Sequence, residues 1–87
     1  MARFKIKIKS TAKKELSKLP KNDMQKVIRK IRSLSLNPRP SGCEKLTGEE
    51  KYRVRQGNYR IVYSIEDDRL IVVVVKIGHR KDVYKKR

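Results

Sequence analysis

Residues 52–77, YRVRQGNYRIVYSIEDDRLIVVVVKI, contain three strand patterns in succession and define the fold class. Residues 52–55 alternate basic side chains with larger apolar ones, and residues 59–65 are rich in β-branched and aromatic types, as strands are. The segments 56–58 and 66–69 between these runs are typical of turns. Residues 70–77 are nearly all β-branched, which predicts a central strand buried on both faces. The stretch therefore predicts an antiparallel meander.

The N-terminal third predicts one more strand and a helical hairpin. Residues 4–9 alternate apolar side chains with lysines, so one face of this strand should meet the core. Ser10 or Thr11 can cap a first helix, which Pro20 ends. Asn22 or Asp23 can cap a second helix. The buried face of the second helix is marked by Met24, Val27, Ile28, Ile31 and Leu34.

The order of these segments predicts the architecture. Two helices joined by about two residues form an antiparallel hairpin, and this hairpin must cover one face of the sheet. Residues 37–51 are punctuated by proline and glycine and are expected to form a loop. We expect one α+β domain spanning 1–87, of order β-α-α-β-β-β, with an antiparallel sheet covered on one face by the helical hairpin.

Several classes of protein are excluded by composition. No apolar run reaches the 18 residues that a membrane-spanning helix needs, and the N-terminus has no continuous apolar core of a signal peptide. The single Cys43 cannot form an internal disulfide, and with the single His79 it cannot build a zinc site. We therefore expect a cytoplasmic protein with no cofactor, no metal and no membrane partner.

The charge points to an anionic partner. The 87 residues carry 25 Lys+Arg against 9 Asp+Glu, a formal net charge of +16. The charge lies in residues 1–33 and 52–87, whereas residues 34–51 are neutral. Such an excess repels itself in a compact state, so nucleic acid or an acidic protein partner would offset it. An anionic membrane fits less well because the apolar helix stripes are needed for the core.

A cluster of arginines is the candidate site. Arg53 and Arg55 lie two residues apart on one strand and so share a face, and Arg60 follows across a short turn. Three more candidates follow the last strand, and all six side chains are expected to converge on one face: His79, Arg80 and Tyr84. Clustered guanidinium groups suit a phosphate, whose oxygens match their rigid donor fork. The nearby strand tyrosines, Tyr52, Tyr59 and Tyr63, are expected to pack across strands, with stacking on unpaired bases as the alternative.

Four segments together carry a family resemblance. They are Leu46-Thr47-Gly48, Tyr52-Arg53-Val54-Arg55, Tyr59-Arg60-Ile61-Val62-Tyr63 and Ile77-Gly78-His79-Arg80-Lys81-Asp82-Val83-Tyr84. The chain resembles the RelE branch of the RelE/ParE toxins of bacterial type II toxin–antitoxin systems, over nearly its whole length.

The resemblance implies a fold, an activity and partners. It implies a RelE-like toxin that cuts messenger RNA in the A site of the 30S ribosomal subunit, an mRNA interferase. The ribose 2′-hydroxyl attacks the adjacent phosphate and leaves a 2′,3′-cyclic phosphate and a 5′-hydroxyl. It also implies a cognate RelB-like antitoxin, which could lie along the cationic surface and block Arg80 and Tyr84.

The resemblance assigns roles residue by residue. Arg60 and Arg80 match arginines that hold the scissile phosphate, and Tyr84 matches a tyrosine that stacks on a base. Arg53 and Arg55 stand where the best-known member has lysines; since arginine does not give up its proton, we expect them to bind phosphate rather than act as a base. Protons would then be moved by His79 or Tyr84. The further RNA-binding candidates are Lys81 and Lys85.

Two other functions compete with RNA cleavage. The ParE side of the superfamily poisons DNA gyrase, and fold and charge alone do not separate it from the RelE side. A plain RNA-binding module without catalysis would also carry this charge. The Gly-His-Arg segment at 78–80, with Tyr84 and the strand arginines, favours RNA cleavage.

Overall fold

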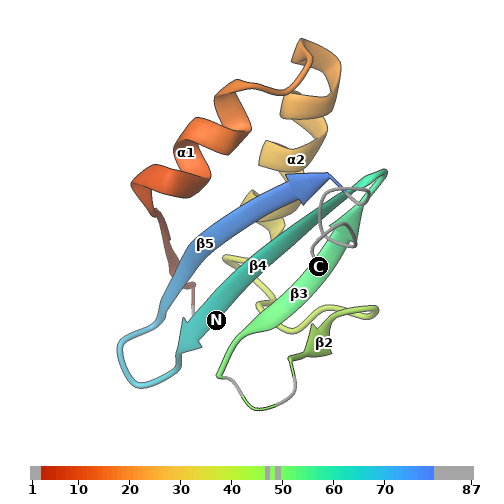
Figure 1. Cartoon of the computed structure of the whole chain (residues 1–87). Helices are drawn as coiled ribbons and strands as arrows, with labels where there is room; N and C mark the ends of the chain where they lie inside the picture. Colours follow the sequence, from red (N-terminus) through yellow and green to blue (C-terminus); the bar gives the residue numbers. More distant parts are fainter. Residues whose placement is uncertain (1–2, 47, 49, 80–87) are drawn as a thin grey trace.

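The computed structural model describes residues 3–46, 48 and 50–79, and within these it has two helices and one five-stranded sheet (Figure 1). In chain order the elements are β1 (Lys5–Ile8), α1 (Ser10–Ser17), α2 (Lys21–Ser33), β2 (Glu44–Lys45), β3 (Tyr52–Gln56), β4 (Tyr59–Glu66) and β5 (Ile71–His79). The predicted order and the α+β class are confirmed. The two-residue strand β2, in the expected loop, was not predicted.

The sheet has the strand order β1-β5-β4-β3-β2. Strands β3, β4 and β5 form the predicted antiparallel meander, with Val54 opposite Ile61 and Ile61 opposite Ile77. Strand β1, however, pairs parallel with β5, from Lys5 opposite Ile71 to Ile8 opposite Val74. The prediction of a wholly antiparallel sheet is therefore wrong at this edge. Alternation indicates which face of a strand is buried but carries no information about the direction of the strand.

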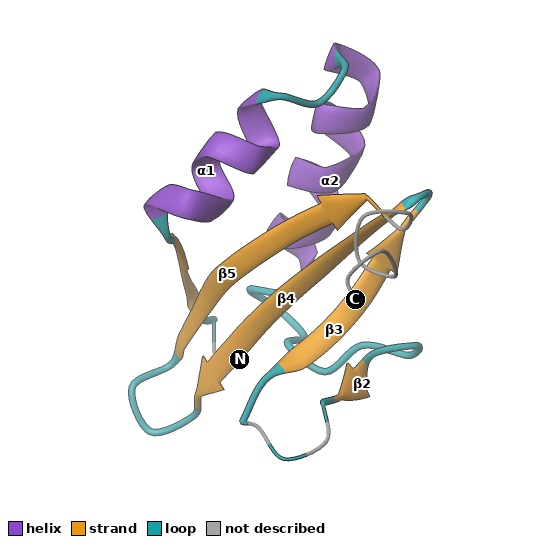
Figure 2. Cartoon of the chain, in the orientation of Figure 1, coloured by secondary structure: helices purple, strands orange, loops and turns teal. Residues whose placement is uncertain are grey.

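Both helices lie on the same side of the sheet, with α1 beside β5, so the molecule has two layers (Figure 2). The core fills the space between these layers. Its fully buried members are Ala12, Val27, Ile31, Leu34, Val54, Ile61, Tyr63, Val72, Val74 and Ile77. Burial of this apolar surface is the main favourable contribution to folding. We call the covered side of the sheet the helix face and the other side the open face.

Strand β5 is buried on the helix face alone. Val72, Val74 and Ile77 are buried, whereas Val73 and Val75 are half-buried. The prediction of burial on both faces is wrong because both helices of the described residues lie on the helix face. Residues 74 and 77 both face the core despite their odd spacing, since a register shift opposite Val62 and Tyr63 adds one residue to β5.

Neither predicted helix cap forms. Helix α1 has Lys9 at its N-cap and α2 has Pro20, and neither end has a side-chain capping hydrogen bond. Asp23 lies instead in the first turn of α2, where its negative charge still favours the helix dipole. Its Oδ2 accepts a hydrogen bond from the hydroxyl of Tyr59 at 3.0 Å, which ties the start of α2 to β4.

The loop after α2 is fastened to the meander by polar contacts. The buried Tyr63 hydroxyl donates to the backbone carbonyl of Pro38 at 2.8 Å. Arg39 donates to both carboxylate oxygens of Asp67, at 3.1 and 2.9 Å, and its guanidinium lies 5.2 Å from the ring centre of Tyr52. The Arg39 hydrogen bond lowers the pKa of the Asp67 carboxyl. These contacts hold the chain that leads into β2 at the edge of the sheet.

Candidate nucleic-acid interface

The register of the meander places three arginines on the open face. Arg55 lies directly opposite Arg60, whereas the neighbouring pair, Val54 and Ile61, points into the core. Arg53 is two residues from Arg55 and lies diagonal to Arg60, so it shares their face. We call the surface formed by Arg53, Arg55 and Arg60 the arginine face. The strand pairing thus brings together three of the predicted site residues.

The three arginines differ in how far solvent reaches them. Arg55 is exposed, the Arg53 side chain is 28% exposed, and Arg60 is only 2% exposed. Arg60 lies opposite Gly78 of β5, which has no side chain on the open face beside it. A buried guanidinium is held in one orientation, whereas an exposed one can move to meet a ligand. Arg60 is thus the fixed member of the arginine face and Arg55 the accessible one.

Among the described residues, the carboxylate of Glu44 lies on the arginine face. Glu44 of β2 is the cross-strand partner of Arg53, so their side chains leave the sheet on the same side. Arg53 Nη2 donates to Glu44 Oε1, and the Glu44 side chain is 62% exposed. The hydrogen bond from Arg53 lowers the pKa of the Glu44 carboxyl, and the charges of Arg53, Arg55 and Arg60 act in the same direction. Glu44 therefore lies within the electric field of the whole cluster.

Sequence reasoning missed Glu44. It falls in a stretch that reads as a neutral loop, and no local pattern predicts a strand of two residues. The signal would have been the pairing of residue 44 with residue 53, which depends on how the long loop returns to the sheet.

His79 lies on the helix face rather than with the arginines. Its ring meets the Tyr59 ring edge to face, with centroids 5.2 Å apart, and Tyr59 in turn is bonded to Asp23 of α2. Desolvation, with the hydrogen bond to Asp23, raises the pKa of Tyr59. His79 also borders a cavity of about 430 Å³ between α1 and the end of β5, lined by Glu15, Lys18, Leu19 and Ile77 among others.

The strand tyrosines also lie on the helix face. Tyr63 is fully buried, and Tyr52 stacks on it with ring centroids 6.0 Å apart and an interplanar angle of 26°. Tyr59 lies on the same face, where its hydroxyl donates a hydrogen bond to Asp23 of α2. The expected cross-strand packing of these rings is confirmed, and in the described part of the chain none of the three faces the arginines.

Four of the predicted site residues lie outside the described residues. They are Arg80, Lys81, Tyr84 and Lys85. The described chain ends at His79, one residue beyond Gly78, the partner of Arg60. In the sequence, these residues follow directly after β5, whose last residues lie next to Arg60.

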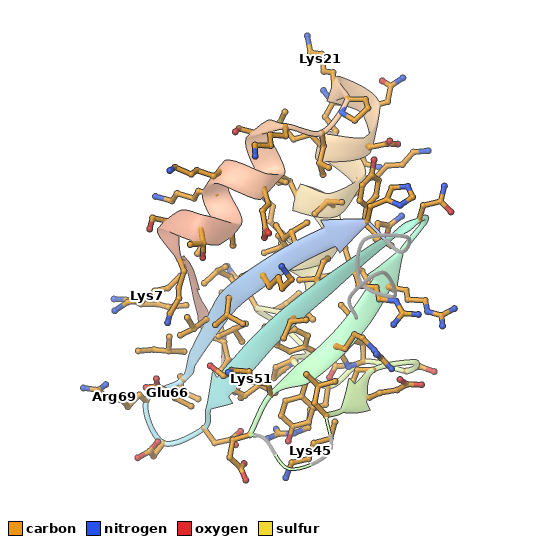
Figure 3. The ribbon with its side chains drawn as sticks, viewed as in Figure 1. Lys7, Lys21, Lys45, Lys51, Glu66 and Arg69 are labelled. Atoms are coloured by element: carbon orange, nitrogen blue, oxygen red, sulfur yellow. The ribbon has the colours of Figure 1, made fainter. Side chains whose placement is uncertain are left out.

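Other basic side chains are spread around the molecule. Figure 3 shows Lys7, Lys21 and Lys45 extending outward from β1, α2 and β2 in different directions. Within the described ranges, no helix is long and apolar enough to cross a membrane, and no three His, Cys, Asp or Glu side chains group as metal ligands would. The concentration of arginine on the open face is therefore the feature that distinguishes a site from a generally cationic surface.

The sequence is similar to known toxins over nearly its full length. Residues 6–84 match the family described as the ParE toxin of type II toxin–antitoxin systems. A protein of Methanocaldococcus jannaschii named as toxin RelE1 is 33% identical over 87 residues, covering 95% of this chain and 97% of that protein. Toxin RelG of Mycobacterium tuberculosis is 30% identical over 87 residues, covering 95% and 98% of the two chains.

The fold is similar to that of a solved toxin–antitoxin complex. The crystal structure of the complex RelBE2 from Mycobacterium tuberculosis contains a chain that superposes with a TM-score of 0.83 and 29% identity. The match covers 92% of this chain and 94% of that one. Sequence and structure thus lead to the same group of proteins.

Proposed function

The chain belongs to the RelE/ParE family of toxins of type II toxin–antitoxin systems, and from this premise we propose that it is a ribosome-dependent mRNA endoribonuclease. The observation that carries the proposal is the arginine face: three guanidinium groups gathered on the sheet face opposite the two helices, one of them buried and fixed. Like charges placed directly opposite each other destabilise a sheet. An anion that binds between them removes this cost.

The proposed reaction is attack of a ribose 2′-hydroxyl on the adjacent phosphate, at a codon in the ribosomal A site. Charge builds up on the phosphoryl oxygens in the transition state, and positioned guanidinium groups stabilise it. Arg60 is proposed to hold the phosphate in register, with Arg53 and Arg55 as further clamps. Arg80 follows β5 directly in the sequence and is proposed to complete the clamp, with Lys81 and Lys85 on the flanking backbone.

The proton transfers need groups other than arginine. Of the two candidates, we propose Tyr84 ahead of His79, because the His79 ring packs against Tyr59 on the helix face. The small number of acid and base groups supports dependence on the ribosome, which would hold the messenger in a reactive geometry. If His79→Ala cleaves a ribosome-bound messenger as fast as the wild type, His79 carries no proton in the reaction.

A cognate antitoxin is the second proposed partner. The similar solved structure from Mycobacterium tuberculosis is itself a complex of a toxin with its antitoxin. We propose that a RelB-like antitoxin covers the arginine face with an acidic segment, since its charge would replace that of RNA. Bound antitoxin should then protect residues 53–60 from hydrogen exchange or chemical modification, and an absence of protection there and at 78–87 would contradict this.

The test is primer extension on a defined messenger in a reconstituted translation reaction. Wild-type protein should produce discrete cuts at A-site codons that vanish when ribosomes are omitted. Arg80→Ala should lose the cuts, and Arg55→Gln should strongly reduce them. An intact messenger in the presence of folded wild-type protein would overturn the proposal.

Inhibition of DNA gyrase is the second candidate function, and the match to the ParE toxin family favours it. The same arginine face could receive an acidic protein surface instead of RNA. A gyrase cleavage-complex assay run beside primer extension separates the two, because each function predicts a signal in one assay only. A protein active in neither assay that still binds RNA in a salt-dependent way would be a plain RNA-binding module.

A further inference from the structure

The ring pair formed by Tyr59 and His79 adjoins the proposed phosphate clamp in the sequence and in the sheet. Tyr59 comes directly before Arg60, and His79 comes directly before Arg80. In the register of β4 with β5, Tyr59 lies opposite His79, and the next rung pairs Arg60 with Gly78. Successive residues of a strand point to opposite faces. The rings therefore lie on the helix face, directly behind the backbone that carries Arg60 on the open face.

The contact between the two rings joins the start of β4 to the end of β5. The ring centroids are 5.2 Å apart and the ring planes meet at 85°, the edge-to-face arrangement that aromatic pairs prefer. Both residues are half-buried, so the contact is partly shielded from water. Because one ring comes from each strand, the pair fixes how the two strand ends lie relative to each other.

A hydrogen bond attaches the ring pair to the helical layer. The Tyr59 hydroxyl donates to Oδ2 of Asp23 at 3.0 Å, and Asp23 lies in the first turn of α2. Burial, together with this hydrogen bond, raises the pKa of Tyr59, so the hydroxyl keeps the proton that it donates. Helix α2 and the two strands are therefore connected at one point through Asp23, Tyr59 and His79.

The last residues of β5 depend on this connection. Strand β1 pairs with β5 only as far as Val74, so in the described part of the chain β4 is the strand that holds Gly78 and His79. Gly78 leaves room beside Arg60 on the open face, but it has no side chain to pack, and a glycine inside a strand weakens the strand. The ring of His79, one residue later, supplies the packing that Gly78 lacks.

We propose that the Tyr59–His79 ring pair is a positioning device that holds Arg60 and Arg80 at the spacing that a scissile phosphate requires. The inference rests on the proposed RNA cleavage. The rings act through the arginines, so they contact no reacting atom and transfer no proton. Guanidinium groups stabilise the transition state most when they are held where its charge develops. A displacement of about 1 Å can cost about 100-fold in rate.

The test separates a ring that positions the arginines from a ring that carries a proton. His79→Ala removes the ring, whereas His79→Phe keeps an aromatic ring that cannot titrate. The control is Leu16→Ala, because Leu16 of α1 packs against the same core and its truncation lowers stability without removing either ring. Each variant is assayed by single-turnover cleavage of a ribosome-bound messenger, at a temperature at which thermal melting shows it to be folded.

The rates are measured over a pH range that spans the ordinary pKa of histidine, about 6.5. Among the described residues, the ionisable side chains that line the cavity beside His79 are Glu15, Lys18, Tyr59 and Lys76. The variants leave all four in place. A limb of the pH profile that is lost in His79→Phe would therefore belong to His79 itself.

His79→Ala should lower the maximal rate about 10–100-fold and change the half-maximal concentration less. His79→Phe should recover most of the lost rate and keep the pH profile of the wild type. Leu16→Ala should cleave at nearly the wild-type rate, although it melts at a lower temperature.

Three results would overturn the positioning role alone. They are a His79→Ala rate equal to that of the wild type, a Leu16→Ala rate as low as that of His79→Ala, and a His79→Phe variant that stays slow or loses a limb of the pH profile. A folded wild-type protein that leaves the messenger intact would overturn the proposed function as well.

Discussion

On the helix face of the sheet, aromatic and aliphatic side chains are held by defined partners, whereas on the open face the arginines lie side by side. The Tyr59 hydroxyl donates a hydrogen bond to the Asp23 carboxylate, and the Tyr63 hydroxyl donates one to the Pro38 carbonyl. Ile61, between them on the same strand, is fully buried. Across the sheet, Arg55 and Arg60 stand directly opposite each other with like charge. The helix face stabilises the fold through burial, whereas like charges directly opposite each other are unfavourable in a sheet. Strand β4 contributes alternate residues to both.

The largest expected effect is the loss of a core side chain on β4. Ile61→Ala should destabilise the domain by about 2–5 kcal/mol, because it leaves a cavity between the sheet and the helices. The matched variant is Val62→Ala, one residue along and half-buried on the open face. Urea denaturation measures both. Equal losses at 61 and 62 would contradict the division of the sheet into a structural face and a ligand face.

The next effect concerns activity rather than stability. Arg55→Gln should reduce RNA cleavage by about 10–100-fold, the value of a hydrogen bond to a charged group, since Arg55 is the accessible member of the proposed phosphate clamp. The free energy of unfolding should stay within about 0.5 kcal/mol or rise at low salt, as repulsion from Arg60 is removed. Arg29→Gln, on the exposed side of α2, is the control. A loss of activity equal to that of Arg29→Gln would remove Arg55 from the site.

A smaller effect is expected from a hydroxyl on the helix face. Tyr63→Phe should cost about 1–2 kcal/mol, because the Pro38 carbonyl loses its donor. Burial raises the pKa of Tyr63 above its ordinary value near 10. The folded state then holds the phenol proton more tightly than the unfolded state, so this stability is present below about pH 10 and is lost as the pH rises further. Alkaline denaturation of the variant should be less steep, and an unchanged profile would speak against this burial.

The smallest expected effect is at the outer edge of β5. Glu15 of α1 accepts the backbone N–H of Ile77 at 2.8 Å and pairs with Lys76 at 3.2 Å, in a stretch of β5 beyond its pairing with β1. Glu15→Ala should cost about 1 kcal/mol and speed hydrogen exchange at the Ile77 amide. Glu15→Gln keeps an acceptor and should slow exchange again toward the wild-type rate. Equal exchange in both variants would show that charge, not the hydrogen bond, holds this edge.

The two faces also differ in how well the sequence predicts them. Alternation along residues 52–65 places Val54 and Ile61 inward and the arginines outward, as observed. Strand β5 places His79 on the same face as Ile77, the helix face, so the expectation that His79 joins the arginines is wrong. Local periodicity was therefore sufficient for the sides of β3 and β4, whereas in β5 the register shift interrupts it.

What the sequence could not predict depends on contacts between distant segments. The parallel direction of β1, the burial of Arg60 and the pairing of Glu44 with Arg53 all require knowledge of which strands become neighbours. The predicted cap at Asp23 failed for a similar reason, since its carboxylate accepts a hydrogen bond from Tyr59 of β4. A local sequence pattern is least able to predict the position of a residue whose partners lie in distant segments of the chain.

The division between the faces is tested most directly by single-codon cleavage on the ribosome, measured for folded wild-type protein and Arg55→Gln in parallel. The account predicts discrete cuts at A-site codons by the wild type, strongly reduced by Arg55→Gln, with both proteins melting at closely similar temperatures. An intact messenger with the wild type, or equal cleavage by the variant, would contradict it.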